Sequence, residues 1–275
     1  NRIYMLITTK KLIHTVVSIS KDAGSAIMDI YNQNDASVEY KLDKTPVTKA
    51  DLNSHDIIKH RLKLVTDNIP ILSEEDTQVS FSERSEWDEY WLIDPLDGTK
   101  EFLNRNGEFT VNIALMRKNR PIFGVIYSPV NNETFWGCEG YGSYEFSEVR
   151  GETRIMVSNK NKKRIACSRS HQKSSEIEDF ANEYSYEMIK IGSSYKFCML
   201  AKGNVDIYPR LGPTSEWDIA AGHAILIHAG GSIIDFSGKE IFYNKENLIN
   251  PNFIAASSKV LANNIKEIIT NEERK

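Results

Sequence analysis

The chain has 275 residues, of which 34 are basic and 38 acidic, so its formal net charge is −4, and 40% of its residues are hydrophobic. This composition is typical of a globular protein with one large or two modest domains, and it excludes the basic surface that nucleic-acid binding requires. No apolar run approaches the roughly 20 residues that span a bilayer, which excludes an integral membrane segment.

The first half of the chain is predicted to begin with two helices and to continue as strands. Apolar residues recur at helical spacing from Leu12 to Ile30, and a second helix is predicted from about residue 48 to 65. The stretch between them is expected to be extended, because the residue before Pro46 is biased away from helix. Segments rich in Val, Ile, Phe and Tyr predict strands at 69–73, 90–93, 109–116 and 122–127, and a strand pair in TFWGCEGYGSYEF.

From about residue 164 the pattern changes to strands that alternate with helices, which indicates an α/β layer. The polar stretch at 147–164 is the expected seam between two halves. We therefore expect an N-terminal α+β subdomain over residues 1–155 and a C-terminal α/β subdomain over residues 156–275.

The segment WLIDPLDGTKEF, residues 91–102, places two carboxylates at the end of an apolar strand. A strand that ends in Asp94 and turns at Pro95 can aim Asp94, the Leu96 carbonyl and Asp97 into one space, and Mg²⁺ prefers such oxygen ligands. Gly98 lets the backbone approach an anion, and Thr99 offers an N–H and a hydroxyl. The alternative is a pair of surface turns, which so short a motif does not exclude.

Three further acidic residues stand at predicted element ends. Glu74 follows a strand in ILSEED, Asp51 opens a helix in TKAD, and Asp218 opens another in SEWD. Each has a local explanation, because acidic residues favour helix N-termini and Ser215 with Asp218 has the spacing of a capping box. Spacing alone does not show that these residues converge.

Together with SEED before it and WDIAAGHA after it, WLIDPLDGTKEF resembles the inositol monophosphatase superfamily of metal-dependent phosphatases. DGTKEF, NGEFTVNIAL, SRSH, GSSYKFC and YPRLGPTSEWDIAAGHA resemble its CysQ-type 3′(2′),5′-bisphosphate nucleotidase branch. The resemblance covers about residues 45 to 253. It implies an α/β class, layered α/β/α/β/α sugar-phosphatase fold with two subdomains, a metal site between them, and inhibition by Li⁺.

The resemblance also implies a role for individual residues. The expected ligands of two or three Mg²⁺ ions are Glu74, Asp94, the Leu96 carbonyl, Asp97 and Asp218. The expected catalytic residues are Asp51, which would position or deprotonate water, with Thr99 and Glu74. The expected substrate contacts are Gly98 and Thr99 at the scissile phosphate, and Ser168, His171, Ser193 and Lys196 at the nucleotide.

Lys196 has two readings. It could be a solvated lysine on a helix flank, or it could bind a second phosphate beside Gly192-Ser193-Ser194.

The implied reaction is Mg²⁺-dependent hydrolysis of the 3′-phosphate of 3′-phosphoadenosine 5′-phosphate (PAP), with the sulfated precursor as a further substrate. An inositol or sugar monophosphatase and a non-catalytic nucleotide sensor are the alternatives. The expected partner is a small nucleotide and not a nucleic acid, and a monomer is expected, with a dimer as the alternative. Three widely spaced cysteines fit neither a disulfide framework nor a zinc motif and indicate a reducing, cytoplasmic location.

Overall fold

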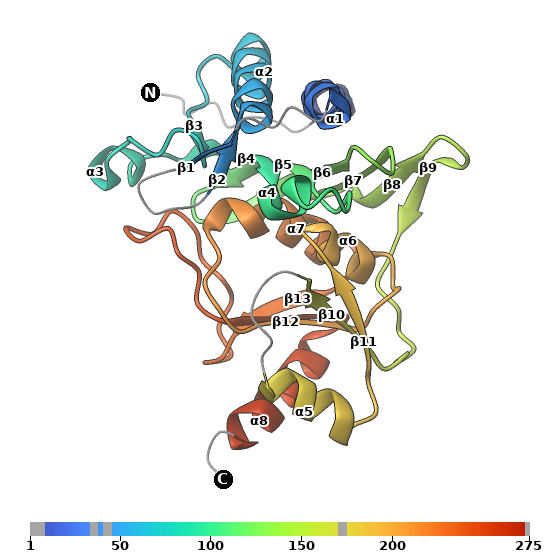
Figure 1. Cartoon of the computed structure of the whole chain (residues 1–275). Helices are drawn as coiled ribbons and strands as arrows, with labels where there is room; N and C mark the ends of the chain where they lie inside the picture. Colours follow the sequence, from blue (N-terminus) through green and yellow to red (C-terminus); the bar gives the residue numbers. More distant parts are fainter. Residues whose placement is uncertain (1–8, 34–37, 41–45, 170–174, 273–275) are drawn as a thin grey trace.

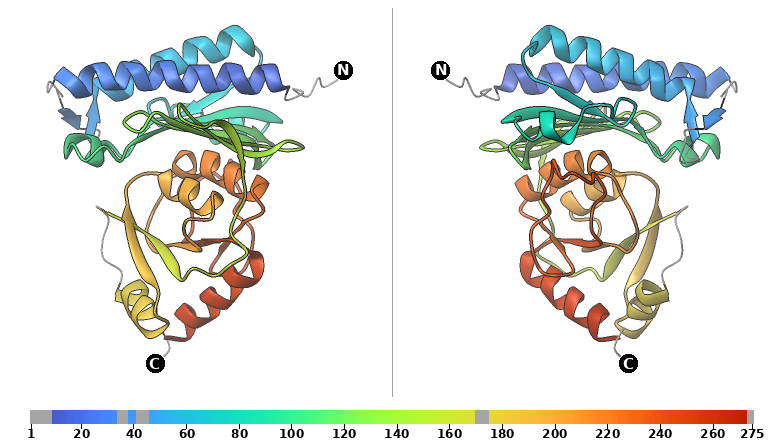
Figure 2. Two further views of the ribbon diagram at one scale, coloured as in Figure 1. Left: turned by 90° about the vertical axis from the view of Figure 1, so that its right-hand side faces the viewer. Right: turned by 90° about the vertical axis from the view of Figure 1, so that its left-hand side faces the viewer.

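The computed structural model describes residues 9–33, 38–40, 46–169 and 175–272, and these residues form a stack of alternating helical and sheet layers. Figures 1 and 2 show two long helices above a first sheet, a central helical layer, a second sheet, and two helices at the far end. This is the α/β/α/β/α order that the resemblance implies. Among the described residues, no helix has both the length and the apolar character needed to cross a bilayer.

The first layer consists of the two predicted N-terminal helices, α1 (Lys10–Gln33) and α2 (Lys49–Val65). Both bury a stripe of apolar side chains against the first sheet, for example Ile19 on α1 and Ile58 on α2, each with no exposed area. α2 begins at Thr48, whose hydroxyl accepts a hydrogen bond from the Ala50 N–H. The two helices lie side by side in both views of Figure 2.

The first sheet has seven strands in the order β3-β4-β5-β6-β7-β8-β9, and its neighbours are antiparallel apart from the parallel pair β3 and β4. The strands are β3 (Ile71–Ser73), β4 (Glu89–Asp97), β5 (Thr110–Arg117), β6 (Arg120–Ser128), β7 (Glu133–Cys138), β8 (Gly142–Ser147) and β9 (Gly151–Ile155). A separate two-stranded sheet pairs β1 (Val38–Tyr40) with β2 (Pro46–Thr48).

Two details of this sheet differ from the prediction. β4 does not end before Asp94 but continues to Asp97, with its register against β5 shifting between these two residues. Such a bulge bends a strand and re-aims its side chains. The stretch expected to be a polar seam contains β9, whose side chains alternate between partly buried and exposed at the sheet edge, so its polar composition resembles that of a loop.

The central layer contains α6 (Tyr195–Ala201) and α7 (Glu216–His228). α7 is apolar and buried over most of its surface, because sheets cover it on both sides. It lies very close to the first sheet at two glycines: an added Cβ at Gly124 would be 2.5 Å from the Ala221 carbonyl oxygen, and one at Gly137 would be 2.6 Å from the Ile225 Cα. No larger residue fits at these contacts.

The second sheet has the order β11-β10-β12-β14-β13. Its strands are β10 (Arg164–Ser168), β11 (Glu187–Ile191), β12 (Ile207–Arg210), β13 (Ser232–Asp235) and β14 (Phe253–Ala256). The last layer, α5 (Ser175–Glu183) and α8 (Lys259–Glu272), packs on its outer face. The chain passes from one sheet to the other between Ile155 and Arg164, and the division into two subdomains stays a prediction.

Two short helices, α3 (Phe81–Arg84) and α4 (Thr99–Leu103), complete the described elements. Neither of them was predicted from the sequence, and β14 and α8 were not predicted either.

Candidate metal and substrate site

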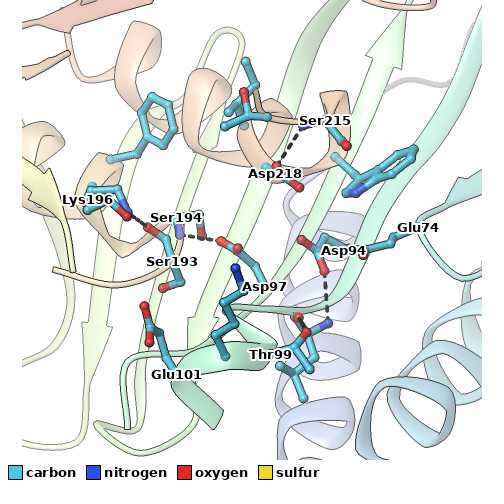
Figure 3. A pocket seen from close by; sticks show the side chains of 18 of the residues that line it. Glu74, Asp94, Asp97, Thr99, Glu101, Ser193, Ser194, Lys196, Ser215 and Asp218 are labelled. Carbon is cyan, nitrogen blue, oxygen red and sulfur yellow. Dashed lines mark hydrogen bonds between the residues drawn. The ribbon is translucent and has the colours of Figure 1, made fainter. Parts of the chain in front are cut away.

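A cavity of about 710 Å³ opens between the first sheet and the central helices. Its walls come from the ends of β3, β4, β10 and β12, from α4, and from the first turns of α6 and α7. Figure 3 shows Glu74, Asp94 and Asp218 on one side of this cavity and the Lys196 side chain on the other. Ten of the twelve predicted site residues line it: Glu74, Asp94, Leu96, Asp97, Gly98, Thr99, Ser168, Ser193, Lys196 and Asp218.

Three carboxylates converge at one end of the cavity. Glu74 follows β3, Asp94 lies within β4, and Asp218 is in the first turn of α7; one oxygen atom from each lies within 4.8 Å of the other two. Figure 3 shows the three side chains pointing toward one another. The three carboxylates that the family resemblance assigned as metal ligands therefore lie together.

The environment of the cluster favours a cation. Burial and the negative charge of the neighbouring carboxylates raise the pKa of Asp94 and of Asp218 well above the usual range. A buried group of mutually repelling carboxylates is stabilised by a hard divalent cation, whose preferred ligands are oxygen atoms. The donor set thus fits Mg²⁺.

The capping role of Asp218 is compatible with metal binding by the same carboxylate. Its Oδ2 accepts a hydrogen bond from the Ser215 N–H at 2.8 Å, which caps α7 and orients the carboxylate (Figure 3). The local explanation from the capping box and the functional explanation are therefore both satisfied by one side chain.

Asp97 lies beside this cluster and makes different contacts. Its Oδ2 accepts hydrogen bonds from the Ser194 N–H and, at 3.4 Å, from the Asn112 amide. Burial raises the pKa of Asp97, and the nearby Lys196 ammonium opposes that rise. The Leu96 carbonyl oxygen, another predicted ligand, lies 3.4 Å from the Thr99 hydroxyl.

Thr99 and Asp51 form a hydrogen-bonded pair at the start of α4. The Thr99 hydroxyl donates to Asp51 Oδ1 at 3.2 Å, while Asp51 Oδ2 accepts from the Thr48 N–H at 2.8 Å. Burial raises the pKa of Asp51 to about 6. Gly98, before Thr99, has a φ of 91°, a conformation that favours glycine and brings the backbone to the cavity wall.

Lys196 lies on the opposite wall and is 4% exposed, so the solvated-lysine reading is wrong. Its ammonium donates to the Ser193 carbonyl at 2.5 Å and to the Ile191 carbonyl at 3.2 Å. Burial lowers the pKa of Lys196 to about 8, and the charge of Asp97 opposes this.

Arg210, at the end of β12, is a candidate site residue that was not predicted from the sequence. It is 9% exposed and lines the cavity. Its Nη2 donates to the Pro213 carbonyl at 3.1 Å, while its buried Nε has no hydrogen-bond partner among the described residues. A buried, partly unsatisfied guanidinium is suited to an anionic ligand. The signal was an arginine that ends an otherwise apolar strand, IYPR.

Two more of the predicted nucleotide contacts have a defined place. Ser168 is the last residue of β10, and Ser193 has a φ of 49° in the loop before α6; both line the cavity. His171 lies outside the described residues.

Comparison with known proteins agrees with this geometry. A sequence model of the Inositol monophosphatase family matches residues 9–272. The 3′(2′),5′-bisphosphate nucleotidases CysQ of Salmonella typhimurium and of Escherichia coli K12 are both 42% identical over 245 residues, which is 88% of this chain and 98% of theirs. A crystal structure of CysQ from Bacteroides thetaiotaomicron, 36% identical, matches with a TM-score of 0.78 over 90% of this chain and 97% of that one.

Proposed function

This chain belongs to the inositol monophosphatase family, and we propose that it is a metal-dependent 3′(2′),5′-bisphosphate nucleotidase. It removes the 3′-phosphate of PAP to give AMP and phosphate, and it also accepts the sulfated precursor. The observation that carries this proposal is that the cavity that holds the cluster of Glu74, Asp94 and Asp218 is also lined by two buried cations, Lys196 on the opposite wall and Arg210.

The metal would be held by five oxygen donors: Glu74, Asp94, the Leu96 carbonyl, Asp97 and Asp218. Bound Mg²⁺ supplies neutralisation of the charge on the phosphoryl group and a lowered pKa for water. Two or three ions are proposed, because five oxygen donors, three of them in the β4 bulge, are more than one magnesium site usually takes from a protein.

Thr99 and Asp51 would guide the attacking water. Since the Thr99 hydroxyl donates its proton to Asp51, its oxygen lone pairs are available to accept a proton from water. Asp51 can then receive the Thr99 proton, and a pKa of about 6 suits a base that works near neutral pH. Glu74, across the cluster, would orient the same water, and the Gly98–Thr99 backbone would hold the scissile phosphate.

The opposite wall would hold the rest of a bisphosphate. Arg210 and Lys196 each add a positive charge to the lining, so a second phosphate or sulfate there is favoured over the neutral hydroxyls of a polyol. Ser168 and Ser193 can donate hydroxyl hydrogen bonds along the same wall. This asymmetry distinguishes the nucleotidase proposal from an inositol phosphatase.

The test is phosphate release from PAP and from inositol 1-phosphate, side by side, with Mg²⁺ and with EDTA. We expect an EDTA-sensitive preference for PAP, and its loss in a Thr99→Val protein purified in parallel excludes a contaminating phosphatase. A preference for inositol 1-phosphate would refute the nucleotide assignment, and binding of PAP without turnover would support a sensor instead.

A monomer and a cytoplasmic location remain our proposals. Light scattering of the purified chain tests the first. The second is supported by the wide spacing of the three buried cysteines, which fits no disulfide framework, and is tested by fractionation of the source cell.

A further inference from the structure

One carboxylate, that of Glu108, joins three segments that come from both sheets. Glu108 lies just before β5, and it receives two parallel hydrogen bonds of 2.6 Å from the guanidinium of Arg169, which directly follows β10. Its Oε2 also accepts from the Gly192 N–H at 2.7 Å, beyond the end of β11. Arg169 in turn donates to the Lys190 carbonyl at 2.8 Å. Neither Glu108 nor Arg169 lines the cavity.

Gly192, in the loop that Glu108 contacts, has no room for a side chain. An added Cβ at Gly192 would be 2.8 Å from the Glu108 carbonyl oxygen and 2.7 Å from the Glu101 Cγ. Two residues later, the Ser194 N–H donates to Asp97, as Figure 3 shows. Gly192 and Ser194 are therefore both anchored on the half of the molecule that carries Asp97.

Ser193 lies between these two anchors. Its φ of 49° is unusual for a residue with a side chain, and its side chain faces the cavity. On the neighbouring strand, Ser168 also lines the cavity and immediately precedes Arg169. The Glu108–Arg169 contact is therefore adjacent to both serines: Arg169 follows Ser168 in the chain, and Glu108 accepts a hydrogen bond from Gly192, which precedes Ser193.

We propose that Glu108 and Arg169 form a positioning pair that sets where Ser168 and Ser193 stand relative to the scissile-phosphate cradle at Gly98 and Thr99. The pair thereby determines the affinity for substrates that extend across the cavity. This inference rests on the proposed nucleotidase function, because a bisphosphate is such a substrate.

The Glu108 backbone adds a direct link to the cradle. An added Cβ at Gly98 would be 3.2 Å from the Glu108 carbonyl oxygen and 3.3 Å from the Ser193 Cβ. Gly98 of the cradle therefore lies in contact with both Glu108 and Ser193, so a shift of the loop that contains Ser193 reaches the cradle over a single contact.

A purely structural role makes a different prediction. The side chains of Arg169 and Glu108 are 43% and 26% exposed to solvent, and ion pairs with this degree of exposure contribute little to global stability. Positioning, in contrast, affects substrate binding even where the fold is unaffected.

The chain offers a matched control on the same two strands. Arg164 and Glu187 form a 2.9 Å ion pair, with exposures of 43% and 59%, where β10 and β11 begin. Ser168 and Ile191 mark the opposite, cavity end of this strand pair. Glu187→Ala therefore removes an equivalent ion pair from the same strands without approaching the site.

The experiment compares Glu108→Ala, Arg169→Ala and Glu187→Ala with the unmodified chain. For PAP, we expect Glu108→Ala and Arg169→Ala to raise KM roughly tenfold, since a charge-assisted contact is lost, and to change kcat much less. For adenosine 3′-phosphate, which has no second phosphate, KM should change less than about twofold. Glu187→Ala should leave both substrates unaffected.

Hydrogen exchange gives a readout that needs no turnover. Amides of residues 190–194 should exchange faster in Glu108→Ala than in Glu187→Ala, while melting temperatures stay close. Equal KM values in the Glu108 and Glu187 variants, or equal loss of affinity for both substrates, would overturn the inference. Absence of PAP turnover in the unmodified chain would instead refute the proposed function, and exchange would then decide the positioning role by itself.

Discussion

Replacing Asp94 by asparagine should stabilise the chain in EDTA and remove its Mg²⁺-dependent activity. The substitution keeps the size of the side chain and the Oδ1 atom, which accepts the Leu96 N–H at 3.1 Å. It removes the charge that lies between Glu74 and Asp218. The two effects have opposite signs because the negative charge that destabilises the metal-free site by repulsion is the charge that attracts the cation.

The size of the effect follows from the geometry. At the 4.8 Å limit of the cluster and an effective dielectric constant of about 20, one pair of carboxylates repels by about 3.5 kcal/mol. The raised pKa of Asp94 means that protonation already relieves part of this repulsion, so a net gain of ~1–2 kcal/mol is expected. For a chain of this length, that corresponds to a rise in melting temperature of about 3–6 °C.

With Mg²⁺ present the order should reverse. Magnesium at 100 times its dissociation constant would stabilise the unmodified chain by about 2.7 kcal/mol, whereas the variant should gain little. Turnover of PAP should fall ~10³-fold, because a ligand that stabilises the charged transition state is lost.

The assay is thermal unfolding of both proteins in EDTA and in Mg²⁺, together with PAP turnover. Asp206→Asn is the matched control, since the Asp206 carboxylate is fully buried but accepts the Lys162 and Arg164 N–H groups outside the cluster. It should be destabilised by ~1–3 kcal/mol in both buffers. A lower melting temperature for Asp94→Asn than for the unmodified chain in EDTA would refute the electrostatic reasoning.

Three further predictions concern other parts of the site. Asp51→Asn should lower kcat for PAP ~10²–10⁴-fold with little change in KM, because it removes the proton acceptor of Thr99; a change confined to KM would contradict this role. Because the pKa values of Asp94 and Asp218 are raised, protonation of these groups stabilises the metal-free fold at low pH, and this contribution is lost as pH rises through those values. The rise in melting temperature that Mg²⁺ causes should therefore grow from pH 5.5 to 8. A rise that does not change with pH would count against this reasoning. Arg210→Met should raise KM for PAP about 10- to 100-fold and leave adenosine 3′-phosphate nearly unaffected, which steady-state kinetics on both substrates would reveal; equal losses would refute a second-phosphate role.

Local patterns in the sequence predicted most of the elements that carry the site. The apolar periodicity of α1 and the strand composition of β4 reflect burial on one face or on both, which is a local property. β9 escaped prediction because an edge strand buries few side chains and its polar residues read as a loop.

The convergence of the cluster could not be derived from spacing. Asp94 and Asp218 lie far apart in the sequence, and each had a sufficient local explanation, so only the family resemblance placed them together. Arg210 was missed for a related reason: its value comes from a buried positive charge beside a cavity formed by other segments, which no local pattern encodes.

The close packing of α7 on Gly124 and Gly137 has a consequence for recombination between relatives. Asp218 lies in the first turn of this helix, so its distance from Asp94 depends on how closely the helix backbone packs against the sheet. A chimera that takes its C-terminal half from one family member and its first sheet from another would keep a working metal site only if both glycines came with the sheet. A single alanine at either position would lift the helix and separate the ligands, even where every ligand residue had been retained.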